Sequence, residues 1–127
     1  MDAAIDIVDG TVVVSTFGTA DTAAFGRLLD DVLDHPSFEP GMPLLFDHSE
    51  LAVGGLTPYD VRGIAESLLA REKQLGAGRK AMVAPSDAAY GLARMFAVYA
   101  ETERLRLQAF RDRASAATWL AAASERE

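Results

Sequence analysis

Residues 80–96 read KAMVAPSDAAYGLARMF and contain a strand, a turn and the first turns of a helix. The apolar run 80–84 is typical of a buried strand, and Pro85 stops it. Ser86 or Asp87 can then cap a helix. Its inward face is expected to carry apolar residues at helical spacing, namely Ala89, Leu92, Ala93, Phe96 and Tyr99. A buried strand that leads directly into a helix is the repeating unit of a parallel sheet, so this stretch predicts an α/β fold.

The same strand-and-helix unit precedes this stretch. Residues 42–47 form a short apolar run that predicts another buried strand. Thr57 suits the N-cap of the helix that follows, and Pro58 suits its first position. Asp60 favours the positive end of the helix dipole, and Gly76 suits the position just past the last turn. We expect one helix between these limits, with an apolar stripe formed by Val61, Ile64, Ala65, Leu68 and Leu69.

The chain begins with a predicted β-hairpin. Residues 4–8 alternate between apolar and polar side chains, and Asp9 with Gly10 is a strong signal for a two-residue turn. Residues 11–17 are rich in β-branched and aromatic side chains, as in a second strand. Gly18 and Thr19 are expected to stop this strand.

Helices are predicted after the hairpin and at the end of the chain. The first is expected over about residues 20–34, between a cap at Thr19 or Asp21 and a stop at Pro36. Residues 105–110 alternate and predict the last strand. The last helix should open at Asp112, carry Ala114, Ala117, Trp119 and Leu120 on its apolar side, and end before a solvated tail, Ser124 to Glu127.

The predicted order of elements is ββαβαβαβα. Strands that alternate with helices imply right-handed crossovers and a mostly parallel sheet. We therefore expect an α/β fold with four or five strands, an N-terminal antiparallel hairpin and about four flanking helices. One domain is expected over residues 1–127, with an ordered core of about 3–123.

The composition argues against several classes of function. With 12 basic and 19 acidic residues the net charge is −7, which opposes binding to nucleic acid or to an anionic membrane surface. The chain has no cysteine, and its two histidines, His35 and His48, match no metal-binding spacing, so we expect neither a metal nor a cofactor. No signal peptide or membrane-spanning run is recognisable, which predicts a cytoplasmic protein. High Ala and Arg content beside only two lysines hints at a bacterial source.

Four stretches of the sequence resemble the bacterial SpoIIAA-like, or STAS/Sec14-like, family of small domains. They are residues 38–47, 81–96, 107–112 and 116–120, and residues 90–96, YGLARMF, are the most specific part. The resemblance implies a STAS-like fold and a domain class without established enzymatic chemistry. Among relatives in the wider superfamily, anti-sigma factor antagonists bind partner proteins and are switched by serine phosphorylation. Sec14-like relatives instead enclose lipids or other apolar ligands.

The serine switch of the anti-sigma antagonists is not matched here. That switch lies in an Asp-Ser-Ser-Gly-like turn, whereas the corresponding residues 54–58 read GGLTP. Thr57 is the only hydroxyl residue near this position. Because it is followed by Pro58 and is expected to cap a helix, it is poorly suited to accept a phosphate.

Residues 47–49, Asp-His-Ser, hold the three residue types of a hydrolase triad. Consecutive strand residues point to opposite faces, so they cannot assemble one, and Asp47 and Ser49 are expected to cap the end of a strand. Their position still matters, because ligands in open α/β sheets bind beyond the carboxyl ends of the strands.

A second candidate surface lies on the helix after residue 86, where Tyr90 and Arg94 are four residues apart. Arg94 either forms one exposed patch with Tyr90 or pairs with an acidic neighbour. Met95, Val98 and Tyr99 widen the apolar surface of this helix, which is then either fully buried or shared with a partner.

Three functions remain open from the sequence. The leading one is a non-catalytic STAS-like regulatory or interaction module that binds a protein partner or forms a homodimer. Its predicted contact residues are Asp47, Ser49, Thr57, Tyr90, Arg94, Met95 and Tyr99. The second is a small carrier or sensor of an apolar, lipid-like ligand, with a possible lining from Met42, Phe46, Met82, Met95 and Phe96. The third is a small enzyme that uses Asp47, His48 or Ser49.

Overall fold

The computed structural model describes residues 1–102 and 105–125, the last three of these by their backbone alone. Its sheet has five strands in the order β1-β2-β3-β4-β5. They are β1 (Asp2–Val8), β2 (Thr11–Thr19), β3 (Leu44–Ala52), β4 (Lys80–Val83) and β5 (Leu107–Phe110). β1 and β2 form an antiparallel hairpin, and each later strand pairs in parallel with the one before it. The predicted α/β sheet with an N-terminal hairpin is confirmed.

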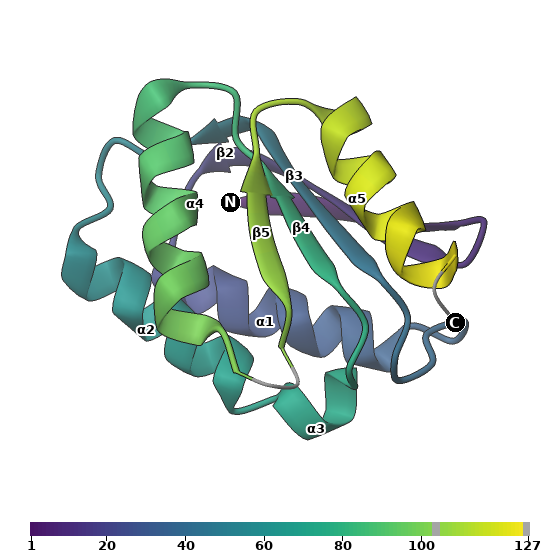
Figure 1. Ribbon diagram of the computed structural model, residues 1–127. Coiled ribbons are helices and arrows are strands. Elements are labelled where there is room, and N and C mark those ends of the chain that lie inside the picture. The colour runs from purple at the N-terminus through teal and green to yellow at the C-terminus, as the bar shows by residue number, and fades with distance from the viewer. Residues whose placement is uncertain (103–104, 126–127) are drawn as a thin grey trace.

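Helices cover both faces of this sheet. In the described residues they are α1 (Thr22–Asp34), α2 (Pro58–Leu69), α3 (Glu72–Leu75), α4 (Asp87–Ala100) and α5 (Arg113–Glu125). Figure 1 shows α1, α2 and α4 on one side of the sheet and α5 on the other. The protein therefore has three layers, with two separate apolar cores.

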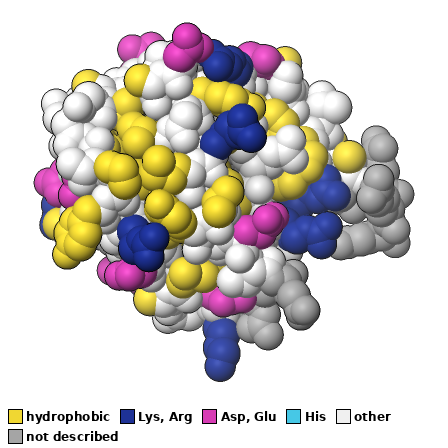
Figure 2. All heavy atoms as spheres, turned by 60° about the vertical axis from the view of Figure 1, so that its left-hand side comes forward, with side chains coloured by type: hydrophobic (Ala, Val, Ile, Leu, Met, Phe, Trp, Pro, Cys, Tyr) yellow, Lys and Arg dark blue, Asp and Glu magenta, His cyan; other side chains and the backbone are white. Residues whose placement is uncertain are grey.

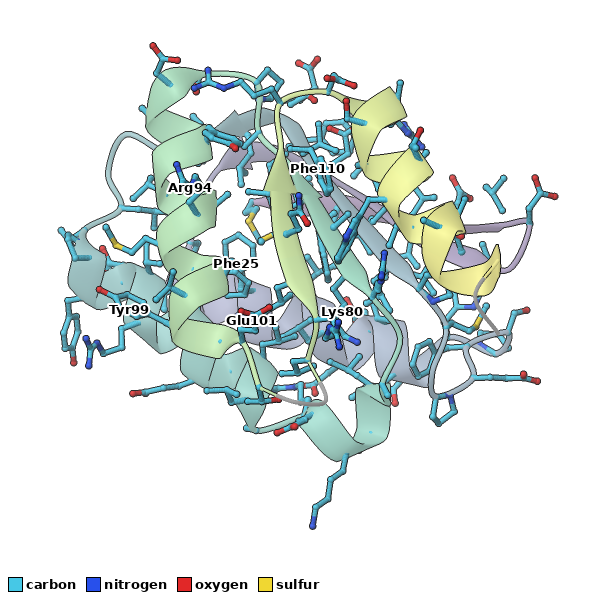
Figure 3. All side chains as sticks on the ribbon, in the orientation of Figure 1. Phe25, Lys80, Arg94, Tyr99, Glu101 and Phe110 are labelled. Atoms are coloured by element: carbon cyan, nitrogen blue, oxygen red, sulfur yellow. The ribbon has the colours of Figure 1, made fainter. Side chains whose placement is uncertain are left out.

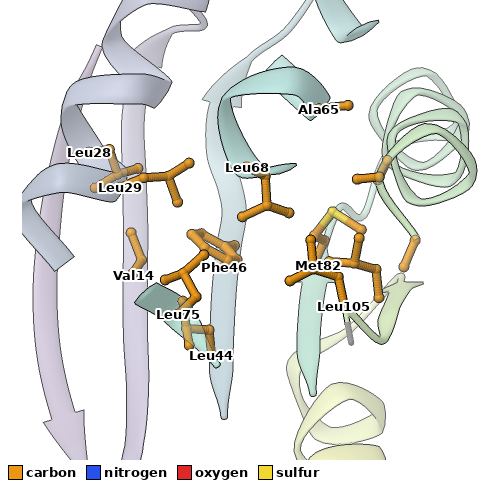
Figure 4. Close-up of a cluster of buried hydrophobic side chains, with 14 of the residues drawn as sticks. Val14, Leu28, Leu29, Leu44, Phe46, Ala65, Leu68, Leu75, Met82 and Leu105 are labelled. Atoms are coloured by element: carbon orange, nitrogen blue, oxygen red, sulfur yellow. The ribbon is translucent and has the colours of Figure 1, made fainter. Parts of the chain in front are cut away.

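The larger core lies between the sheet and the layer of α1, α2 and α4. Side chains from alternate strand positions, such as Val14, Phe46 and Met82, meet Leu28 and Leu68 from the helices (Figure 4). The smaller core lies under α5, where Leu45 and Val83 are examples of strand residues that point the other way. Where both faces of the central strands are buried, at residues 12–14, 44–46 and 81–83, the sequence is a continuous apolar run rather than an alternating one.

The hairpin turn forms where the sequence predicts it, and the second strand is longer than expected. Asp9 and Gly10 both have positive φ angles, 49° and 79°, as a type I′ turn requires. β2 does not stop at Gly18, because its last residues pair with β3 up to Thr19. Helix α1 then starts after Asp21, whose carboxylate accepts a hydrogen bond from the backbone N–H of Ala23.

The helix expected between Thr57 and Gly76 is broken into α2 and α3, which corrects the sequence prediction. Arg71 leaves the helical backbone region, with φ −110° and ψ 10°. Its guanidinium donates to the carbonyl of Ser67 at 2.7 Å and pairs with Asp30 of α1 at 2.8 Å. Arg71 thus ends α2 through contacts to another helix, and Gly76 ends α3 instead of one long helix.

Strand β3 extends five residues beyond the predicted end at Asp47. The pairing with β2 shifts between Ser15 and Phe17, where three steps on β3 match two on β2. This β-bulge lies at His48 and Ser49 and turns the strand, so that the alternation of faces changes after it. Asp47 and Ser49 are therefore inside a strand and do not cap its end.

The C-terminal elements also differ in detail from the prediction. β5 begins at Leu107 rather than residue 105. In α5 the buried residues are Ala116 and Leu120, with Trp119 packed beside them, whereas Ala114 and Ala117 are exposed. Six of the thirteen residues of α5 are alanine, so its sequence carries little directional pattern, and packing on the sheet selects the buried side.

Candidate functional site

An apolar pocket lies between α2 and α4, above the larger core face of the sheet. Its atom-free volume is about 700 Å³, part of which is open to solvent. Figure 3 shows one wall residue, Phe25, between α4 and the sheet. The pocket is lined by Phe25, Leu29, Phe46, His48, Leu51, Val53, Leu56, Val61, Ile64, Leu68, Met82, Ala84, Ala89, Leu92, Ala93 and Phe96. Among these described residues only His48 has a polar side chain.

The pocket sits at the carboxyl ends of β3 and β4, which is where open α/β sheets bind their ligands. Three alanines explain why space remains there. Ala84 follows β4, and Ala89 and Ala93 lie four residues apart on the inner face of α4. Their short side chains face the larger residues of α2 across the pocket without filling it. The other ends of the same elements are closed by larger side chains such as Leu75 and Leu105.

His48 forms the polar point of the pocket. Its ring stacks on Phe46, with centroids 6.2 Å apart, and meets the ring of Phe25 edge-on at 5.8 Å. Nδ1 lies 2.7 Å from the hydroxyl oxygen of Thr16, a residue that is almost fully buried. Burial among these groups lowers the pKa of His48 to about 4, although the neighbouring carboxylate of Asp47 acts in the opposite direction. The ring is therefore neutral at pH 7 and offers one donor and one acceptor.

Asp47 and Ser49 lie outside the pocket. The side chain of Asp47 accepts hydrogen bonds from the backbone N–H and the hydroxyl of Ser49, and it faces Arg113 of α5 at 3.5 Å. Asp47 and His48 are on opposite faces of the sheet, as the strand alternation predicted. These three residues therefore do not form a triad, and Asp47 belongs to a surface cluster beside α5.

Tyr90 and Arg94 share a small cationic surface at the start of α4. The guanidinium of Arg94 lies 5.9 Å from the ring centroid of Tyr90, and that of Arg111 lies closer, at 4.4 Å. Arg111 also pairs with Asp87. In the described part of the chain Arg94 forms no ion pair, so of the two predicted arrangements the structure contains the patch with Tyr90.

Met95 and Tyr99 lie on α4 away from the pocket. Both are half-buried. Tyr99, labelled in Figure 3, packs against the edge of the larger core, and the guanidinium of Arg62 of α2 lies 4.7 Å from the centroid of its ring. Val98, between them, is 76% exposed. The apolar surface of α4 is therefore not fully buried. Figure 2 shows hydrophobic side chains over this helical face, interrupted by basic and acidic ones.

Comparisons with known proteins place the fold but name no function. No family model matches the chain, and no curated protein does. Among solved structures it is similar to an uncharacterised protein of the DUF3478 family from Shewanella loihica PV-4, which is described as having a SpoIIAA-like fold. The match covers 94% of this chain and 92% of the other, with a TM-score of 0.59 and 18% sequence identity. This chain has a SpoIIAA-like fold.

Within this SpoIIAA-like fold, the side chain of Thr57 is engaged in hydrogen bonds at the N-terminus of α2. Its hydroxyl oxygen accepts from the N–H of Asp60 at 3.2 Å and donates to the carboxylate of Asp60 at 3.0 Å. The same carboxylate accepts from the N–H of Thr57 at 2.9 Å, which completes the capping box. The predicted capping role is confirmed.

The pocket of this SpoIIAA-like chain was only partly foreseen from the sequence. Phe46, Met82 and Phe96 line it as the carrier hypothesis expected, whereas Met42 and Met95 do not. Met42 is instead held in its loop, where its sulfur accepts from the N–H of Glu39. The main omission is His48, which was considered only as a metal ligand and as a member of a triad. Its alternation with Phe46 along the strand was the signal that places it on the core face.

Neither a metal centre nor a membrane span is found in the described residues, 1–102 and 105–125. No group of three or more His, Asp or Glu side chains is arranged there to hold a metal ion. No helix in the same ranges combines the length and the apolar character needed to cross a bilayer.

Proposed function

We propose that this protein is a non-catalytic STAS-like module that binds an apolar small molecule in the pocket between α2 and α4. The pocket itself is the observation that carries the proposal. Small-molecule sites are mostly apolar clefts with a few polar groups, and the lining of this pocket fits that description. The carrier or sensor function suggested by the Sec14-like resemblance is therefore favoured over the partner-binding function that led on sequence grounds.

The chemistry of the pocket supports a binding role rather than a catalytic one. Nucleophilic catalysis needs a nucleophile beside a base, and acid–base catalysis needs a group placed near the reacting atom. His48 is the one titratable side chain among the described residues of the lining, and its hydrogen-bond partner is the hydroxyl of Thr16. The residues that could have joined it, Asp47 and Ser49, face elsewhere.

The proposal is tested with N-phenylnaphthylamine, an uncharged probe whose fluorescence rises in an apolar site. We expect saturable binding to the wild-type protein. Ala93→Leu adds three carbons to the inner face of α4. The larger side chain should remove apolar contacts of the probe that are equivalent to about two methylene groups, which weakens probe binding by about tenfold. Ala88→Leu makes the same change at an exposed position of the same helix and should bind the probe like the wild type.

Equal affinity of the two leucine variants would contradict the proposal, because the probe would then bind elsewhere. Urea denaturation of both variants serves as the folding control. If Ala93→Leu unfolds at the same urea concentration as Ala88→Leu, or a higher one, loss of binding reports the filled pocket and not a damaged fold.

A second candidate function is association through the outer face of α4, favoured by the exposure of Val98. The side chain of Val98, in the last turn of α4, is 76% exposed, beside half-buried Met95 and Tyr99. Under this candidate the chain pairs with a second copy of itself, and Val98→Asp should convert the dimer to a monomer in size exclusion with light scattering. A wild-type protein that is monomeric at all concentrations and still binds the probe would support the pocket function alone.

A further inference from the structure

The pocket has an apolar wall on every side except at one nitrogen atom. Its lining comes from α1, β3, α2, β4 and α4 and from the loop before α2, and contains no Lys, Arg, Asp or Glu among the described residues. A charged group drawn into such a site would lose its hydration without gaining a counter-charge. A polar group of a ligand that lies inside the pocket, away from its open side, must therefore be matched by His48.

The hydrogen bonds around Thr16 assign the roles of the two ring nitrogens. The hydroxyl of Thr16 donates to the backbone carbonyl of Asp47 at 3.3 Å. Since a hydroxyl carries one hydrogen, its oxygen is then the acceptor for Nδ1–H of His48 at 2.7 Å. In the neutral ring the proton on Nδ1 leaves Nε2 without one, so Nε2 is a hydrogen-bond acceptor.

Nε2 is available to a ligand. Within the described residues it forms no hydrogen bond, and every buried polar side-chain atom in that part of the chain does have a partner. Nε2 is therefore not sealed in the core but exposed, and His48 belongs to the pocket wall. The stacked ring of Phe46 and the edge-on ring of Phe25 limit how the imidazole can turn.

We propose that the ligand is an uncharged amphipathic molecule, whose apolar body fills the space between α2 and α4 and whose hydroxyl or other hydrogen-bond donor donates to Nε2 of His48. Thr16 is the positioning residue, since its hydroxyl holds the proton of the ring on the opposite nitrogen. This inference rests on the proposed function and specifies its ligand class. A ligand carboxylate has only hydrogen-bond acceptors, so it cannot form a hydrogen bond with Nε2, which is itself an acceptor. The low pKa of His48 also makes the protonated ring, which could pair with an anion, rare at pH 7.

The test uses four ten-carbon ligands that differ at one end: decanol, decyl methyl ether, decane and decanoate. Each displaces N-phenylnaphthylamine from the full-length protein at pH 7. Decanol, which can donate, should bind about 5- to 10-fold more tightly than the ether, which can only accept. Decanoate should bind at least tenfold more weakly than decanol, because its charge is buried without a partner.

Two variants separate the role of the ring from general packing. His48→Phe keeps an aromatic ring and removes Nε2, so decanol and the ether should bind with equal affinity. Thr16→Val keeps the shape of the buried threonine and removes the hydroxyl, so the preference for decanol should fall while decane binding stays within about twofold.

The outcomes distinguish the inference from the function on which it rests. If none of the four ligands, decane included, displaces the probe, the proposed function fails and the inference fails with it. If all four displace it but decanol and the ether bind equally in the wild type, the pocket function stands and the role of Nε2 is overturned. Tighter binding of decanoate than of decanol would also overturn it.

Discussion

Acid should destabilise this protein through His48 well before its carboxylates are protonated. The pKa of the folded histidine is about 4, because burial removes water from the ring, and its ordinary value is 6.5. Between these values the unfolded chain binds a proton that the folded chain does not. Stability must therefore fall as the pH drops from 6.5 to 4, and it is fully present above 6.5.

The size of the effect follows from the same two values. One pH unit within this window costs at most about 1.4 kcal/mol, and the whole window at most about 3 kcal/mol. The ring opens onto the pocket and is only partly covered, so water screens some of this cost. We expect a measured loss of between about 1 and 3 kcal/mol.

The assay is urea denaturation of the wild type and of His48→Phe in steps of half a pH unit from pH 7 to pH 4. The variant keeps His35 and all carboxylates, so their contributions cancel in the difference between the two curves. Asp47, which faces Arg113 of α5 and lies next to His48 in the chain, is also present in both. The difference should be constant above pH 6.5 and should shrink steadily below it.

A difference that stays constant from pH 7 to pH 4 would refute the reasoning. The ring would then take up a proton as easily in the folded as in the unfolded chain, which is incompatible with a histidine held between Phe25 and Phe46. A difference that changes in the opposite direction, with the wild type gaining stability in acid, would show that the ring is charged in the folded state.

Two further predictions concern the frame around the pocket. Burial lowers the pKa of Lys80 to about 8 from 10.5, against an opposing effect of Glu72. In urea denaturation the wild type should therefore gain stability relative to Lys80→Met as the pH rises from 8 to 10, by at most about 1.4 kcal/mol per pH unit. Stabilities of the two proteins that change in parallel with pH would contradict this. Gly76→Ala should destabilise the protein by at least about 2 kcal/mol, because φ is +81° and the new methyl would lie 2.3 Å from the backbone nitrogen of Gly41. Gly91→Ala is the control: its methyl meets no described atom within 4 Å, and it should stabilise α4 by about 0.5 to 1 kcal/mol. Similar melting temperatures for the two variants would disprove the close approach of Gly76 to Gly41.

Much of the fold could be predicted because its signals are local. The turn at Asp9 and Gly10 needs two positive φ angles, and the cap at Thr57 needs an acceptor three residues before Asp60. Apolar spacing along the strands and helices likewise depends on near neighbours in the chain. These signals were enough to predict the order of the elements, the mostly parallel sheet and most of the inward face of α4.

The boundaries that were wrong depend on contacts between distant segments. α2 ends early because Arg71 reaches Asp30 of α1, 41 residues away in the chain. β3 runs past Asp47 because β2 offers it further partners, up to Thr19. Neither Arg71 nor Asp47 is surrounded by an unusual sequence, so no local pattern indicates the change.

The pocket was decided by tertiary structure for the same reason. The apolar stripe of α4 is equally compatible with a filled core and with an open one, since periodicity records which side is buried but not how much volume the opposite side supplies. Here Ala89 and Ala93 meet α2 across a space that neither helix fills. His48 acquires its role only because Thr16, on the neighbouring strand, takes one of its nitrogens and leaves the other accessible. Local sequence dictates the elements and their buried sides, whereas the balance of volumes and polar partners among packed elements determines the site.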